Sequence, residues 1–183
     1  LPRKDVFVTK IAPDGRTLVY SAFFPAGESA ETLGLEVDAG GFVYLAGLTA
    51  SNRFPLKNAF QARLGGDMDG FVLKLAKNGK SLVYSSYIGG GGKDMCTALG
   101  VDIQGTAYIG GITASRDFPT RKAYQKSFGG KADAFVAKVS PQGTSLLYST
   151  FLGGTGEDWA SALAVDAAGA VSKETVVEIS LLA

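Results

Sequence analysis

The chain repeats itself every 64 residues, and this repeat constrains its fold more than any other feature. The segment Asp5-Val6-Phe7-Val8 returns as Asp69-Gly70-Phe71-Val72 and as Asp133-Ala134-Phe135-Val136, and Leu18-Val19-Tyr20-Ser21 also returns twice at the same offset. A fixed period of this length indicates a stack of identical supersecondary units. The repeat divides the single array 1–183 into units 5–68 and 69–132, a partial unit 133–171 and a divergent segment 172–183.

Each unit has the pattern of four short β-strands. In the second unit apolar and polar residues alternate, which predicts strands at 71–76, 82–88, 98–103 and 107–112. The first two strands are joined at Asn78-Gly79, a dipeptide that suits the positive φ of a hairpin turn. No segment keeps the 3.6-residue apolar period of a helix. The sequence therefore predicts an all-β fold of four antiparallel strands per unit.

Four strands with apolar groups on both faces, repeated along the chain, are typical of β-propeller blades. The third strand of each unit suits the innermost position, because small residues fit a crowded axis; these are Gly34, Ala98 and Ala162. The sequence contains two complete four-strand sets, an outer pair and a lone inner strand, at 33–88, 98–152, 5–24 and 162–166. At most three blades result, whereas closed propellers have about four to eight. We therefore expect an incomplete propeller, completed by further blades in the same parent chain or by a second copy of this chain.

The recurring motifs resemble a known family. Asp-Ala-Phe-Val-Ala-Lys-Val, Leu-Leu-Tyr-Ser-Thr-Phe-Leu-Gly-Gly, Ala-Leu-Ala-Val-Asp-x-x-Gly and Asp-Phe-Pro together resemble the bacterial SBBP repeat, the seven-bladed β-propeller repeat, over residues 5 to 170. The inner-strand motif is more distantly similar to that of NHL-type propellers. The resemblance implies blades of a bacterial exported or cell-surface protein, and it supplies no catalytic or ligand-binding residues to transfer.

The composition excludes several classes of function. The chain has no histidine, which removes His-dependent catalysis and His metal ligands, and Cys96 is its only cysteine, so no internal disulfide or thiolate zinc site can form. A net charge of +1 gives no basic surface for nucleic acid. No run of 18 apolar residues could span a membrane. We expect no nucleic-acid partner and no membrane span.

Two glycine-rich turns resemble the turns of a calcium-binding repeat. Gly89 to Asp94 and Gly153 to Asp158 match the opening of the Gly-Gly-x-Gly-x-Asp calcium repeat, and Asp67 and Asp69 form a weaker hint. Calcium requires six or more oxygen ligands, and these turns offer few carboxylates. We therefore favour turns in which the aspartate binds local backbone, with no cofactor, and keep calcium as the alternative.

Two further sets of carboxylates stand near the expected inner strands. Asp38, Asp102 and Asp166 begin Asp-x-x-Gly segments, which favours Asx turns over a ring of charges. Glu36 takes the place of Gly100 in the expected inner strand, so it either adapts the axis for a ligand or faces a wet channel.

The long connections 49–68 and 113–132 are the expected binding surface, because loops of this length are often functional. The second contains the candidate ligand residues Arg116, Asp117, Arg121, Lys122, Tyr124 and Lys126. Its recurrent aromatics equally suit a structural role against the blades.

These features favour a non-enzymatic binding or scaffold module that holds a protein or glycan. A hydrolase or lyase acting on an extracellular polymer through acids such as Glu36, and a calcium-stabilised structural array, are the alternatives.

Overall fold

The fold consists of antiparallel β-strands. The computed structural model describes residues 5–26 and 29–165, and within these ranges it has ten strands and no helix. The strands are β1 (Val6–Ile11), β2 (Leu18–Phe24), β3 (Ala30–Val37), β4 (Val43–Thr49), β5 (Asp69–Leu75), β6 (Leu82–Ile88), β7 (Asp94–Val101), β8 (Ala107–Thr113), β9 (Asp133–Val139) and β10 (Leu146–Leu152). The prediction of an all-β fold is confirmed.

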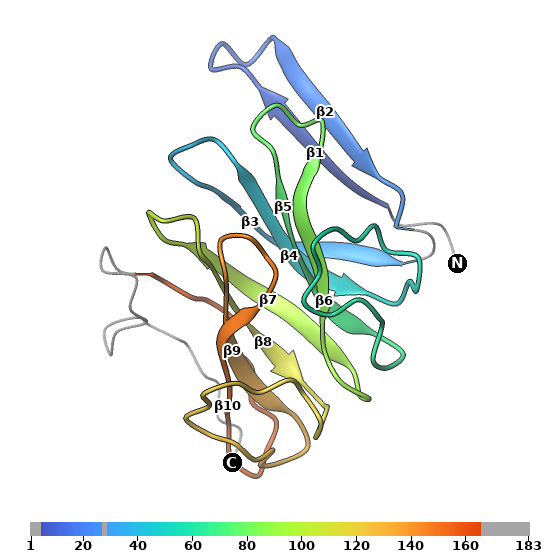
Figure 1. The fold of residues 1–183 in the computed structure, drawn as a ribbon, viewed down its shortest axis with the longest axis vertical. Coiled ribbons are helices and arrows are strands. Elements are labelled where there is room, and N and C mark those ends of the chain that lie inside the picture. The colour runs from blue at the N-terminus through green and yellow to red at the C-terminus, as the bar shows by residue number, and fades with distance from the viewer. Residues whose placement is uncertain (1–4, 27–28, 166–183) are drawn as a thin grey trace.

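The strands form three open sheets that follow one another along the chain. The sheets have the orders β1-β2, β3-β4-β5-β6 and β7-β8-β9-β10, so each four-stranded sheet joins the second half of one repeat unit to the first half of the next. Figure 1 shows them stacked in a row, with β1 and β2 at one end. Strand β7 packs against β3, β4 and β5, which places the face of one four-stranded sheet on the next.

Local turn chemistry explains the hairpins. Gly15, Gly79 and Gly143 have φ near +70° and join β1 to β2, β5 to β6 and β9 to β10. Between β7 and β8, the Asp102 carboxylate accepts hydrogen bonds from the N–H groups of Gln104 and Thr106. Asp38 accepts a hydrogen bond from Phe42 N–H in the same way. The Asx turn is confirmed at Asp102, the Asp38 carboxylate likewise binds the backbone of its own turn, and Asp166 lies outside the described residues.

The predicted strand positions agree with the structure except near two ends. Strand β7 begins at Asp94 rather than at 98, because the first residues after the glycine turn already pair with β8. The inner strand predicted at 162–166 is wrong for 162–165, which have no strand pairing. These residues lie beside β7, where Leu163 and Val165 cover Gly100. Residue 166 and the divergent segment 172–183 lie outside the described residues.

The aromatic residues of the Phe-Pro motifs close the hydrophobic core. The ring of Phe54 lies 4.6 Å from that of Phe71, and the ring of Phe118 lies 4.4 Å from that of Phe135. Each long connection thus packs one aromatic ring against the sheet whose strands it joins. The structural role expected for these recurrent aromatics is confirmed for both phenylalanines, which are buried.

Candidate functional site

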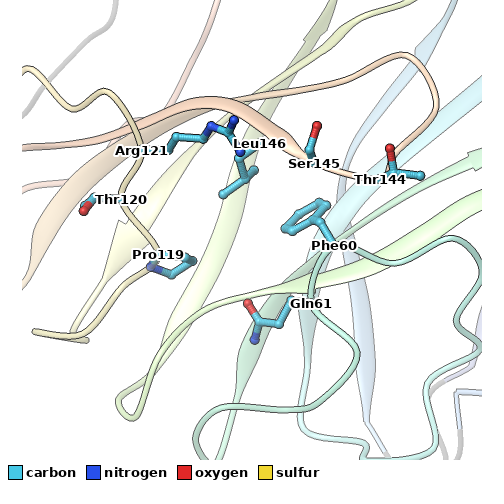
Figure 2. Close-up of a pocket in the computed structure, with 8 residues that line it drawn as sticks. All are labelled: Phe60, Gln61, Pro119, Thr120, Arg121, Thr144, Ser145 and Leu146. Atoms are coloured by element: carbon cyan, nitrogen blue, oxygen red, sulfur yellow. The ribbon is translucent and has the colours of Figure 1, made fainter.

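A groove of about 570 Å³ lies where successive repeat units meet. Its walls are Phe60 and Gln61 from the first long connection, Pro119 to Arg121 from the second, and Thr144 to Leu146 at the start of β10. Figure 2 shows Phe60 below Ser145 and Leu146, Arg121 beside Leu146, and Pro119 and Thr120 on the opposite side from Phe60. The groove therefore takes its walls from three successive units and exists only where the two four-stranded sheets are stacked.

Each long connection is held along the outer edge of its own sheet. Lys57 pairs with Ser85 of β6, and Arg121 pairs with Ser149 of β10, through two backbone hydrogen bonds each. Asn58 and Lys122, which follow these bridges, adopt positive φ angles of 49° and 47°. Because both connections repeat the same backbone course, the groove walls are fixed by the repeat itself.

A partly buried hydrogen-bond network fixes Gln61 at the groove. Its side-chain N–H group donates to the carboxylate of Asp69 at 2.8 Å, and its side-chain oxygen accepts from Gly89 N–H at 3.1 Å. Asp69 also accepts from the N–H groups of Gly65 and Gly66. Burial raises the pKa of Asp69, although these hydrogen bonds oppose the rise. The same network recurs around Gln125 and Asp133 in the next unit.

The calcium candidates occupy these glycine turns. Asp94 accepts hydrogen bonds from Gly90 N–H and from the Ser115 hydroxyl, and Asp158 accepts one from Gly154 N–H. Burial also raises the pKa of Asp94. Asp67 is exposed. Over the described part of the chain, no three acidic, Cys or His side chains are grouped as a metal ion requires. Asp69, Asp94 and Asp158 thus accept hydrogen bonds from backbone N–H groups of the adjacent glycine turns, and Asp94 also from a hydroxyl of the second long connection.

The structure separates the candidate residues of the second connection. Arg121 lines the groove, whereas Asp117 accepts a hydrogen bond from Gly91 N–H and the Arg116 guanidinium lies 5.6 Å from the centre of the Phe128 ring. The remaining three candidates, Lys122, Tyr124 and Lys126, are exposed outside the groove lining. Glu36 is exposed on β3, away from these connections.

Sequence reasoning missed most of the groove. Phe60 and Gln61 belong to an aromatic-Gln pair that recurs as Tyr124-Gln125, and this recurrence was the available signal. Residues 144–146 carry no comparable sequence signal, because only the stacking of the two sheets brings them to the same groove as the first connection.

Comparison of the chain with protein-family models and with curated proteins finds no match. Across residues 5–26 and 29–165, no helix is long and apolar enough to cross a membrane.

Proposed function

We propose that this chain is a non-enzymatic binding and scaffold module whose repeat units are β-propeller blades. The strand orders support it: in each four-stranded sheet the chain runs from one edge to the other, and the short glycine-rich connection 89–93 then leads from β6 to β7, the first strand of the next sheet. This connectivity, with sheets stacked face to face, suits radial repetition. An exported or cell-surface location follows from the resemblance to the SBBP repeat.

The groove between units is the observation that carries the binding proposal. It combines the apolar surfaces of Phe60, Pro119 and Leu146 with the hydroxyls of Thr120, Thr144 and Ser145 and the guanidinium of Arg121. A concave site with apolar walls and a few polar groups is the usual form of a ligand site. Aromatic and hydroxyl groups side by side match the alternating C–H faces and hydroxyls of a sugar. We therefore favour a glycan over a protein as the ligand.

The lining also indicates which glycans to test. It contains one cationic group, Arg121, and no acidic side chain. An uncompensated guanidinium attracts carboxylate or sulfate groups, which it can bind through two parallel hydrogen bonds. The preferred ligand is therefore an acidic polysaccharide such as one containing uronic acids.

Affinity electrophoresis in gels with neutral and uronic-acid polysaccharides tests the proposal. We expect retardation by an acidic polysaccharide, a loss of at least about tenfold in affinity for Phe60→Ala, and a smaller loss for Arg121→Gln. Tyr124→Ala is the matched control, because Tyr124 is the repeat counterpart of Phe60 yet is 90% exposed and outside the groove. Retardation by no polysaccharide, or equal losses for Phe60→Ala and Tyr124→Ala, would refute glycan binding in this groove. Capture of a protein ligand that depends on Phe60 would replace glycan by protein as the ligand.

A further inference from the structure

The β1–β2 hairpin exposes aromatic rings that are buried in the later units. Phe7 and Phe23 are 69% and 63% exposed, whereas their counterparts 64 residues later, Phe71 and Tyr87, are at most 1% exposed. The third unit buries its counterparts as completely, at Phe135 and Phe151. The sequence is nearly the same, so a neighbouring segment makes the difference.

Two features cover the later rings and are absent from β1–β2 in the described residues. First, β5 and β9 pair with a preceding strand, β4 or β8, whereas β1 pairs with β2 alone. Second, the Phe-Pro ring that follows the preceding strand stacks on the pair: Phe54 lies 4.6 Å from Phe71 and 6.0 Å from Tyr87. Phe118 makes the same contacts with Phe135 and Phe151 at 4.4 and 5.9 Å.

An apolar groove of about 270 Å³ lies beside the free edge of β1. It runs between β1 and the sheet that begins with β3, and its lining includes Val8, Ile11, Tyr20, Leu35 and Val43. Leu35 is 56% exposed, but its counterpart Leu99 is 7% exposed because it packs on Gly34 of the preceding sheet, where an added Cβ would lie 2.9 Å from the Leu99 Cβ. Whatever covers Leu35 in the same way therefore needs a small residue, as Gly34 is, at the contact.

The paired strands of the later units define what fits the edge of β1. Opposite Phe71 and Phe135 stand Gly47 and Gly111. A Cβ at Gly47 would lie 1.9 Å from the carbonyl oxygen of Glu31 and 3.0 Å from the Phe71 ring, and a Cβ at Gly111 would meet Met95 and Phe135 in the same way, so the strand and the ring together require glycine. Three residues earlier, Tyr44 and Tyr108 stand opposite Lys74 and Lys138, whose ammonium groups lie 4.8 and 4.6 Å from the centres of the tyrosine rings.

Phe7 and Lys10 occupy the corresponding positions in β1, and both side chains are exposed. The matching strand carries Tyr-x-x-Gly, and in both units the Phe-Pro follows this glycine at the same spacing, as Gly47 and Phe54 show.

We propose that the edge of β1 and its apolar groove bind the second half of a further 64-residue unit: a β-hairpin whose last strand carries Tyr-x-x-Gly, followed by Phe-Pro. The hairpin extends the β1–β2 sheet to four strands, its glycine lies over Phe7, its tyrosine covers Lys10, and its Phe-Pro ring stacks on Phe7 and Phe23. Backbone pairing supplies affinity, and the glycine and aromatic positions supply specificity.

The described residues of a second copy do not supply this hairpin, because both Tyr-x-x-Gly strands, β4 and β8, are already paired with β5 and β9. The sequence from 172 onward does not carry the motif either, since Ser172 and Thr175 stand where the repeat has tyrosine and glycine. The occupant is thus a half-unit that still lacks its outer strands.

A synthetic peptide with the sequence of residues 94–121, added to the full chain, tests the proposal. We expect saturable binding by fluorescence anisotropy and slowed hydrogen exchange at the amides of residues 6–11. Phe7→Ala in the chain should weaken binding at least about tenfold, while Tyr124→Ala in the chain should leave it unchanged. Phe7 is exposed, so its replacement leaves the fold intact.

Three results would overturn the proposal. The peptide does not bind; it binds equally to the Phe7→Ala chain, or without slowing exchange in β1; or the chain alone sediments as a dimer with β1 already protected, which would make a second copy the occupant. The glycan proposal rests on Phe60 and is unaffected by any of these results.

Discussion

Three phenylalanines occupy equivalent positions in the repeat, and replacing each of them in turn distinguishes the effect of local sequence on stability from the effect of tertiary packing. Phe7, Phe71 and Phe135 occupy the same place in three units, but only Phe71 and Phe135 are fully buried. Truncating a buried phenylalanine to alanine costs about 3–5 kcal/mol in unfolding free energy, from lost burial and the cavity left behind. Phe135→Ala removes the ring that lies 4.4 Å from Phe118 at the centre of the aromatic cluster, so we expect a cost in the middle of that range.

The cost at Phe7 follows from its exposure. About a third of this side chain is buried, and full burial of a phenylalanine is worth about 1.5–3 kcal/mol. Phe7→Ala should therefore cost about 0.5–1 kcal/mol, several times less than Phe71→Ala or Phe135→Ala.

Urea unfolding followed by far-UV circular dichroism measures these differences. With a slope near 2 kcal/mol per M, the Phe135→Ala midpoint should fall by about 2 M and the Phe7→Ala midpoint by less than about 0.5 M, at unchanged slope. An equal loss at Phe7 and Phe135 would refute the reasoning, because it would mean that Phe7 is buried in solution.

Four further predictions concern turns, titration, the thiol and calcium. Gly143→Ala places a Cβ 2.0 Å from the Tyr84 ring at a φ of +74°, whereas Gly15→Ala meets nothing within 4 Å at +67°; urea unfolding should show a loss of about 1–2 kcal/mol for Gly15→Ala, from backbone strain, and a clearly larger loss for Gly143→Ala. Burial raises the pKa of Asp94 above its ordinary value of 3.8, so its contribution to stability is fully present below that value and is lost as the pH rises through the folded-state pKa. Lowering the pH from 7 to 4.5 should therefore stabilise the unaltered chain relative to Asp94→Asn, and parallel pH profiles would contradict this. Cys96 is fully buried, and burial raises the pKa of its thiol, so an aromatic disulfide reagent should label it only as fast as the chain unfolds; rapid labelling in native buffer would exclude this environment. Because the turn aspartates already accept hydrogen bonds from their own turns, the melting temperature should be the same with excess calcium as with chelator, and a rise with calcium would favour the calcium-stabilised array.

The candidate site was harder to predict than the strands. Arg121 was found because it belongs to a long connection, yet Lys122 beside it and Tyr124 have the same sequence context and lie outside the groove. The network around Gln61 shows why: its amide binds Asp69 and Gly89, residues that lie far along the chain from one another. Contacts between residues that are distant in the sequence cannot be predicted from the local sequence around Gln61.

The strands, the hairpin turns and the division into units could be predicted from local sequence. Alternation along a strand and the positive φ of a turn glycine are local properties, so they are read from a few neighbouring residues. Which of the equivalent residues are buried, and where the groove lies, depend instead on how the sheets pack together. Phe7 and Phe71 share one sequence context, and only the strand and Phe-Pro ring packed against Phe71 distinguish them. Likewise, Phe60 lies in the groove while Tyr124 is exposed, because a following unit stacks against Phe60 within the described residues.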